Sequence, residues 1–332
     1  MDALRGLAAV AVCWCHFIGH VPLSPGILLE LGTQGSLGVQ VFFVLSGFVI
    51  PLSLARSNYS PHLFFRFLAR RIVRLDPPYL ASVLLVLIFV FLKARFVTSI
   101  GGRTPVDSPE QLFSHLAYAT EVLGYQWLNP VYWTLAIEFQ FYLLIGLIFP
   151  FVMHSSRLVR YGTLLLFLLC AQLPISHPGL ILRFLPWFSL GILACYYRLG
   201  MSSVHELWVG AAAIAALFWR QWIPQETFVL LATCLALAFW RAPCGRPLAW
   251  LGSISYSLYL THIVFGAGFL VLGQALHLPA WFNYPLVIAA TAFSIVTAAG
   301  FHRVVEAPAL RLASRITLRP GSAPKLHQPT PA

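Results

Sequence analysis

The chain has 332 residues, of which 59% are hydrophobic and 9% are charged, and its formal net charge is +11. A soluble domain carries about 25% charged residues, because these side chains cover the surface that faces water. The composition therefore excludes a soluble domain, a disordered chain, a disulfide scaffold and a soluble nucleic-acid binder. Runs without a charged residue, such as 247–302, exceed the roughly 20 apolar residues that cross a bilayer. We expect an all-α, polytopic membrane bundle.

Apolar segments predict about ten membrane-spanning helices. They cover 4–21, 36–54, 78–92, 132–152, 162–176, 181–197, 206–221, 227–240, 251–272 and 284–302. The first begins with the polar residues Asp2 and Arg5 and has no small-residue cleavage site. We therefore interpret it as a spanning helix rather than as a removable signal peptide.

The distribution of basic residues predicts the orientation. If both termini lie in the cytoplasm, 16 of the 21 Lys and Arg residues fall on the cytoplasmic side. The opposite orientation would invert this ratio and violate the positive-inside rule. The basic excess is thus mostly a consequence of topology and does not indicate nucleic-acid binding.

The segment 93–131, on the far side of the membrane, contains a predicted helix that does not span it. Ser108 is followed by Pro and Glu, a sequence typical of a helix start. Leu112, Leu116 and Leu123 then give an apolar face. We expect this helix to lie along the membrane interface.

Three ionisable residues are predicted to lie deep within spans, where such groups are costly and usually functional. A rise of about 1.5 Å per residue places His16 roughly 16 Å from the cytoplasmic edge and Glu138 roughly 9 Å from the opposite edge. His262 lies at a depth similar to that of His16. We expect the three to share one polar cavity, in which a carboxylate beside an imidazole would suit a general base. The alternative is that each has only a structural role.

The segment 55–77 alternates arginines with aromatic residues on the predicted cytoplasmic side, and it ends with Arg70, Arg71 and Arg74 before two prolines. Arg71 and Arg74 are three residues apart, so on a helix they share a face. Such a pair can hold phosphate groups by bidentate hydrogen bonds. The alternative is topology alone, or binding of anionic lipid headgroups.

Other motifs favour packing. Ser46-Gly47 is interpreted as a close-packing step between helices, and a nucleophilic serine is the less favoured alternative. Four aromatic residues either line an acceptor cavity or pack: Trp133, Tyr142, Tyr256 and Tyr259. No metal site is expected, because Cys13 and Cys15 would point about 200° apart on a helix.

Six sequence blocks, in order along the chain, resemble the acyltransferase family 3 membrane proteins, which include O-antigen and exopolysaccharide O-acetylases. The blocks are DALRGLAA at 2–9 with His16 after it, GVQVFFVLSGF at 38–48, RRIVRLDPPYL at 70–80, NPVYWTLAIEFQFY at 129–142, SYSLYLTH at 255–262 and VEAP at 305–308.

The resemblance implies transfer of an acyl group, usually acetyl, from cytoplasmic acyl-CoA to a hydroxyl of an acceptor, usually a sugar of a surface glycan. It implies acyl-CoA as a co-substrate, no bound cofactor, and a bacterial inner-membrane location. Carried onto this chain, it makes His16 the catalytic residue with Glu138, and it places the acyl-CoA phosphates near Arg71 and Arg74, with Arg70 and Arg5 nearby. His262, Trp133 and Tyr259 are the further candidates for the cavity.

The expected domain organisation is a membrane acyltransferase domain over 1–307 and a polar, proline-rich, disordered cytoplasmic tail over 308–332. The first motif begins at position 2, whereas family members usually have several residues before it. We therefore expect either a misassigned start codon or a missing amino-terminal anchor. The hydrolase-like carboxy-terminal domain of some relatives is not found, so the chain either acts alone or needs a separate periplasmic transfer protein.

Two other classes of function fit parts of the sequence. A proton-coupled transporter also uses buried Glu and His, but it predicts two repeated halves, which the sequence does not show. A non-catalytic scaffold of a glycan-export complex predicts that replacing His16 leaves function intact. Neither explains why the six blocks occur together.

Overall fold

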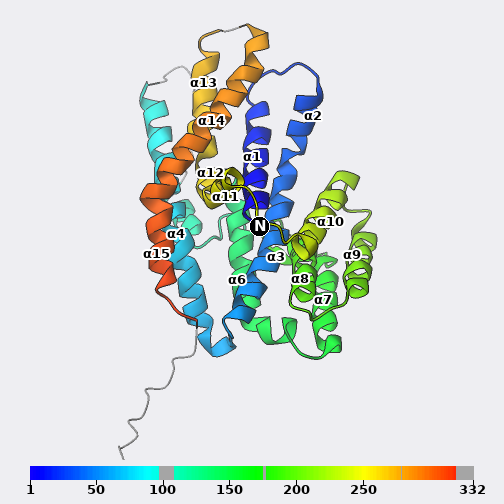
Figure 1. Ribbon diagram of the computed structural model, residues 1–332. Coiled ribbons are helices and arrows are strands. Elements are labelled where there is room, and N and C mark those ends of the chain that lie inside the picture. The colour runs from blue at the N-terminus through cyan, green and yellow to red at the C-terminus, as the bar shows by residue number, and fades with distance from the viewer. Residues whose placement is uncertain (97–107, 175–176, 278, 319–332) are drawn as a thin grey trace, which may run out of the picture.

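The computed structural model describes residues 1–96, 108–174, 177–277 and 279–318, and every regular element in this part of the chain is a helix. The helices pack into one bundle, in which α1 begins near mid-height and runs upward (Figure 1). The α-helices are α1 (Asp2–Ile18), α2 (Ile27–Thr33), α3 (Gly38–Arg56), α4 (Phe64–Phe96), α5 (Pro109–Leu116), α6 (Tyr132–Val152), α7 (Arg157–Ala171), α8 (Leu185–Arg198), α9 (Val204–Phe218), α10 (Pro224–Phe239), α11 (Arg246–Ser253), α12 (Ser255–His262), α13 (Gly268–Gln274), α14 (Asn283–Phe301) and α15 (Ala307–Ser314).

Short 3₁₀ and π-helices extend several of these elements. The 3₁₀-helices are η1 (Gln34–Leu37), η2 (Pro61–Leu63), η3 (Ile181–Phe184) and η5 (Ala280–Phe282). The two π-helices are η4 (Ile263–Ala267), between α12 and α13, and η6 (His302–Glu306), between α14 and α15. π-Helices are rare and often occur at functional sites.

Each of the ten predicted spans contains a helix. Within the described ranges, five helical segments are long and apolar enough to cross a membrane by length and composition: Ile27–Arg56, Pro61–Leu92, Tyr132–Val152, Ser255–Gln274 and Ala280–Ser314. The all-helical membrane bundle is therefore confirmed. The number of ten spans and the cytoplasmic location of both termini stay predictions.

The outer surface of α4 has the character expected of a helix in lipid. Leu84, Ile88 and Phe91 lie three or four residues apart, on one side of the helix, and are 57%, 45% and 68% exposed. A soluble protein seldom exposes such a stripe of large apolar side chains, because contact with water is unfavourable.

The arginine-rich segment 55–77 lies between the second and third predicted spans, and most of it is helical. From Phe64 onward it forms the first half of α4, which continues through Pro77 and Pro78. Prolines are tolerated in membrane helices when neighbours bind the exposed backbone groups. Pro77 and Pro78 leave the carbonyls of Val73 and Arg74 without helical partners, and the Tyr256 hydroxyl donates a hydrogen bond of 3.0 Å to the adjacent Leu75 carbonyl. The arginines therefore have fixed helical positions.

Helix α5 begins where the sequence predicts. The Ser108 side chain caps it by accepting a hydrogen bond of 3.3 Å from the Gln111 backbone N–H. The helix ends at Leu116, so Leu123 lies beyond it. Its exposed face is apolar, and its buried face carries the polar residues Gln111, Ser114 and His115. The apolar face is thus turned away from the bundle.

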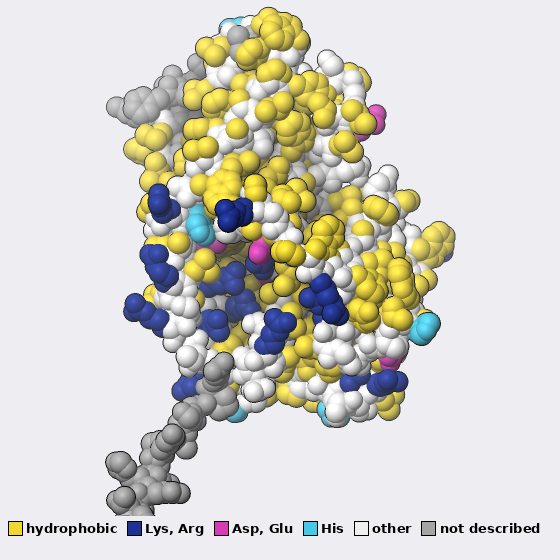
Figure 2. Space-filling view, in the orientation of Figure 1, with side chains coloured by type: hydrophobic (Ala, Val, Ile, Leu, Met, Phe, Trp, Pro, Cys, Tyr) yellow, Lys and Arg dark blue, Asp and Glu magenta, His cyan; other side chains and the backbone are white. Residues whose placement is uncertain are grey.

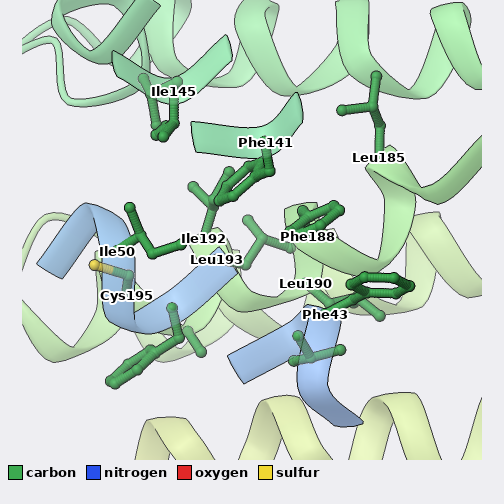
Figure 3. Packing of buried hydrophobic residues seen from close by; sticks show 14 of the residues in the cluster. Phe43, Ile50, Phe141, Ile145, Leu185, Phe188, Leu190, Ile192, Leu193 and Cys195 are labelled. Atoms are coloured by element: carbon green, nitrogen blue, oxygen red, sulfur yellow. The ribbon is translucent and has the colours of Figure 1, made fainter. Parts of the chain in front are cut away.

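The largest apolar core joins α3, α6 and α8 (Figure 3). The Phe141 ring stacks on the Phe188 ring with centroids 4.0 Å apart and an interplanar angle of 13°. Phe43 lies beside Phe188, with ring centroids 5.1 Å apart. This core fixes the inner faces of α3 and α6, which carry Ser46 and Glu138.

Two glycines bring the backbones of α3 and α8 together. A Cβ atom on Gly47 would lie 2.1 Å from the Phe188 carbonyl oxygen, and one on Gly191 would lie 2.0 Å from that of Val44. Real Cβ atoms do not approach oxygen so closely, so only glycine fits at both positions. The interpretation of Ser46-Gly47 as a close-packing step is confirmed for Gly47.

The segment expected to form the tail, 308–332, begins inside α15. This helix packs against α4, with Ala309 and Ala313 buried. Leu318 is also buried, in the large core. Residues 319–332 lie outside the described part of the chain.

Candidate active site

A cavity of about 370 Å³ lies near the middle of the bundle. On the face shown in Figure 2, a hollow is visible at this height, with Lys and Arg side chains gathered in and below it and acidic and His side chains at its upper rim. Its charged and ionisable lining comes from five elements, α1, α4, α6, α12 and η6, and consists of Asp2, Arg5, Arg71, Arg74, Glu138, Tyr142, Tyr256, Tyr259, His302 and Glu306.

Three arginines predicted from the sequence meet in this cavity. Arg71 and Arg74 come from one face of α4, and Arg5 comes from the first turns of α1. Within the described ranges, none of their guanidiniums forms a hydrogen bond or an ion pair with the protein. Donors that are partly buried and have no protein partner can bind an anion.

The Arg71 guanidinium is held by aromatic rings. It lies 5.4 Å from the centroid of Phe67, one turn earlier in α4, and 5.1 Å from that of Tyr142 in α6. Cation–π contacts of this kind orient a guanidinium without using its N–H groups. The five donors of Arg71 therefore remain for a ligand.

Arg70 is not among the residues that line the cavity. It precedes Arg71 directly, so its side chain leaves α4 about 100° further around the helix. Of the four arginines that the sequence analysis singled out, the structure brings three together and separates this one.

Glu138 lies in the same cavity. Its Oε1 atom accepts hydrogen bonds from the Ser46 hydroxyl, at 2.8 Å, and from the Tyr142 hydroxyl, at 2.6 Å. It also attracts Arg5 and Arg71 electrostatically. Ser46 thus contributes to the site as the partner of a carboxylate, a role that the sequence analysis did not assign to it.

Tyr259 lines the end of the cavity nearest His262, here called the deep end, with the two ring centroids 6.2 Å apart. Its hydroxyl forms a hydrogen bond of 2.8 Å with the Thr134 hydroxyl, and its ring contacts the Phe42 ring at 5.6 Å. Trp133, also predicted for the cavity, is not among the lining residues and instead packs against Phe43 and Phe184. Neighbouring residues on α6 point in directions about 100° apart, so only Thr134 of this pair faces the cavity.

His16 and His262 form a pair beyond this deep end. The Nδ1 atom of His16 lies 3.0 Å from the Nε2 atom of His262, although 246 residues separate them. The Nδ1 atom of His262 in turn lies 2.9 Å from the Leu258 carbonyl oxygen. His262 is fully buried, and neither histidine is among the residues that line the cavity.

The expected convergence of His16, His262 and Glu138 is thus found for the two histidines only. Thr134, one turn before Glu138, contacts Tyr259, which lies one turn before His262. The start of α12, at Tyr256, and the later part of α6, at Tyr142, both contact the arginine-bearing part of α4. α6 and α12 therefore run in opposite directions, so Glu138 and His262 lie on opposite sides of this contact, roughly 10 Å apart along the bundle. The partners of Glu138 are Ser46 and Tyr142 rather than an imidazole.

Glu306 also lines the cavity, although it was not predicted as a site residue. Its Oε2 atom lies 2.5 Å from the Ser257 hydroxyl and 2.9 Å from the His302 Nδ1 atom. His302 is the last residue of the predicted span 284–302, and Glu306 lies just beyond that span, a position that water can reach. The π-helix η6 instead turns them inward, and Glu306 is buried. No sequence signal beyond the VEAP block indicates this.

Within the described ranges, no group of three or more His, Cys, Asp or Glu side chains is arranged to hold a metal ion. Cys13 is buried in the apolar cluster around α1 and α14, and the Cys15 thiol lies 3.7 Å from the Thr33 carbonyl oxygen.

Comparison with known proteins gives a consistent result. The family model of an acyltransferase domain matches residues 1–302. The chain is 29% identical to the acyltransferase MdmB of Streptomyces mycarofaciens, over 95% of this chain and 92% of that protein. It is 28% identical to the putative membrane-bound transacylase BcsY of Komagataeibacter xylinus, over 79% of this chain and 71% of that protein.

A third relative is longer. The chain is 27% identical to the O-acetyltransferase OatA of Staphylococcus aureus over 82% of its own length, but it spans about half of OatA, 52%. No solved structure matches the chain.

Proposed function

The chain belongs to the acyltransferase family whose domain model covers residues 1–302, and from this premise we propose that it transfers an acyl group, in the first instance acetyl, from acyl-CoA to a hydroxyl of a carbohydrate. The proposed acceptor is a cell-surface or exported glycan, or a small glycoside. The proposed setting is the bacterial inner membrane, with the chain as a multi-pass protein and acyl-CoA entering from the cytoplasm.

The observation that carries the proposal is the group of three arginines in the cavity whose guanidiniums, within the described ranges, form no hydrogen bond or ion pair with the protein. CoA carries a diphosphate and a 3′-phosphate, and guanidiniums bind phosphate by paired, charge-assisted hydrogen bonds. Arg71 and Arg74, from one helix face, and Arg5, from another helix, offer three such groups around one space. Glu138 would keep Arg5 and Arg71 directed into the cavity by charge attraction.

The proposed route for the acyl group runs along α1. Arg5 and His16 are eleven residues apart, close to three full turns, so they share a face of α1 and lie about 16 Å apart along its axis. With its phosphates at the arginines, an extended pantetheine arm would carry the thioester past Tyr259 toward His16. The deep, apolar end of the site would exclude water and limit hydrolysis.

Two chemical routes are open at His16. In the first, His16 removes the proton from the acceptor hydroxyl, the oxygen attacks the thioester carbonyl, the C–S bond breaks, and the proton passes to the CoA thiolate. In the second, the imidazole takes the acyl group and then passes it to the acceptor. An acyl group trapped on His16 supports the second route, and a sequential kinetic pattern without it supports the first.

The donor site is tested by acetyl-CoA binding to purified protein in nanodiscs. We expect Arg71→Ala and Arg74→Ala each to weaken binding by roughly 10- to 100-fold, since a hydrogen bond to a charged group is worth about 1.5–3 kcal/mol. Arg70→Ala is the matched control, because it removes the same charge from the same helix outside the cavity. Equal weakening by Arg70→Ala and Arg71→Ala would show that general surface charge, and not this cavity, attracts the donor.

A further inference from the structure

The two buried histidines form a directed chain of hydrogen bonds. Its first contact joins His16 Nδ1 to His262 Nε2 at 3.0 Å, and its second joins His262 Nδ1 to the Leu258 carbonyl oxygen at 2.9 Å. The two ring centroids are 5.1 Å apart. The chain therefore begins at a partly exposed imidazole and ends on a helix carbonyl.

The carbonyl at the end determines the direction of every bond. A carbonyl oxygen only accepts, so His262 Nδ1 carries a proton and donates it to Leu258. A neutral imidazole has one N–H, so His262 Nε2 has a lone pair and accepts. His16 Nδ1 must then be the donor, which leaves the lone pair of neutral His16 on its Nε2 atom.

The position of His262 is rigid. The residue is fully buried at the end of α12, where the chain passes into the π-helix η4. Its ring contacts the rings of Phe17 and Tyr259, with centroids 6.1 and 6.2 Å away. Both of its nitrogens have partners, so His262 itself has no free atom with which to react.

No other described side chain takes this role toward His16. His20, one turn later and exposed, bonds through its Nδ1 atom to the His16 backbone carbonyl at 2.7 Å rather than to the ring. The partners of Glu138 are Ser46 and Tyr142. The imidazole of His16 is therefore oriented by a second imidazole, together with a hydrogen bond to the Val12 backbone one turn earlier in α1, and not by a carboxylate.

We infer that His262 is a positioning residue that holds His16 as the Nδ1–H tautomer, so that His16 Nε2 is the atom that takes the proton or the acyl group. The inference rests on the proposed function for its chemical consequence. Nε2 takes the proton from the hydroxyl of the carbohydrate, and the oxygen of that hydroxyl bonds to the acyl carbon. The C–S bond then breaks, and the CoA thiolate later receives the proton from Nε2. The transient charge on His16 is stabilised through Nδ1–H by His262 and the Leu258 carbonyl, as a partner stabilises the imidazolium of other catalytic histidines.

Nitrogen-15 NMR of histidine-labelled protein in bilayers tests the tautomer without any activity. The resonances of His16 are those lost in His16→Ala. We expect a protonated Nδ1 and an unprotonated Nε2 for His16 in the wild type. In His262→Leu, where only the Val12 backbone bond remains, we expect a larger share of the Nε2–H tautomer. A protonated Nε2 on His16 in the neutral wild-type protein overturns the inference.

Kinetics with acetyl-CoA test the consequence. His262→Leu removes the hydrogen-bond acceptor of His16 Nδ1–H and is expected to lower kcat about 10²-fold with KM for acetyl-CoA nearly unchanged. His262→Gln keeps a hydrogen-bond acceptor at this position and should recover most of the lost kcat. The matched control is His115→Leu. His115 is a buried histidine that donates from Nδ1 to a carbonyl four residues earlier, at 2.8 Å, and accepts a backbone N–H on Nε2, at 3.0 Å, in α5.

The outcomes separate the two proposals. An unchanged kcat in His262→Leu, or an equal loss in His262→Gln, overturns the positioning role. The expected NMR result together with no acyl-CoA turnover in the wild type supports the fixed tautomer and rejects the proposed function instead.

Discussion

Arg5 and His16 lie on the same face of α1, eleven residues apart, but only Arg5 lines the cavity, while His16 pairs with His262 beyond its deep end. One helix thus presents an anion-binding side chain and an imidazole about 16 Å apart along its axis. This relationship suits a long co-substrate whose charged end and reactive end lie far apart.

The aromatic contact of Arg71 contributes to donor affinity. We expect Tyr142→Leu, which removes the ring, to raise KM for acetyl-CoA by about 5- to 30-fold, corresponding to roughly 1–2 kcal/mol for a buried cation–π contact. Tyr142→Phe keeps the ring and loses only the hydroxyl bond to Glu138, so its KM should stay closer to that of the wild type. A larger KM for Tyr142→Phe than for Tyr142→Leu would contradict the orienting role of the ring.

The cavity should accept anions from solution. In a variant without the partly exposed native cysteines, we expect Ser46→Cys to react with an anionic thiosulfonate reagent, because the three arginines attract it. CoA should slow this reaction by occupying the cavity. Ser82→Cys is the control, because Ser82 is fully buried in α4 and bonds to Tyr132. Unhindered labelling of Ser46→Cys in saturating CoA would place the donor elsewhere.

Helical phase explains how far the sequence alone could identify this site. The spacing of Arg71 and Arg74 predicts a shared face, and the structure brings both into the cavity with Arg5. Arg70 was grouped with them because it is adjacent in sequence, but its side chain leaves α4 about 100° around the helix from that of Arg71. Adjacent charged residues on a helix cannot all face one ligand, and a single sequence does not show which of them does.

Contacts between distant helices were not predictable in the same way. The His16–His262 pair and the Ser46–Glu138 bond join residues 246 and 92 positions apart. They depend on the rotation of each helix about its axis, which packing of the whole bundle determines. Depth estimates therefore placed Glu138 with the histidines, whereas it lies roughly 10 Å from His262 along the bundle, beside Ser46 and Tyr142.

The predicted orientation can be tested with one native and one introduced cysteine. Cys244 lies in the segment between α10 and α11, and Gln221 lies between α9 and α10. With both termini in the cytoplasm and ten spans, Cys244 faces the cytoplasm and Gln221→Cys faces the periplasm. An impermeant thiol reagent added to spheroplasts should therefore label only the second site. The reverse pattern would invert the topology.

The close contact of α3 and α8 predicts a clear effect on stability. Gly47→Ala places a Cβ atom against the Phe188 carbonyl, and we expect a loss of about 1–3 kcal/mol or more in the free energy of unfolding. Gly162→Ala in α7 is the control, because no atom lies within 4 Å of its added Cβ. That control should be neutral or gain about 0.5–1 kcal/mol from helix propensity. Thermal unfolding in detergent measures both, and equal midpoints would refute the close contact.

The central claim is that His16 carries out acyl transfer from acyl-CoA. The most direct measurement follows CoA release and protein labelling by purified protein in nanodiscs with radiolabelled acetyl-CoA and a crude glycan fraction. We predict turnover in the wild type and in His20→Ala, and a loss of at least about 10²-fold in His16→Ala. Full turnover in His16→Ala would contradict the role of His16. A wild-type protein that neither binds nor turns over acyl-CoA would contradict the account as a whole.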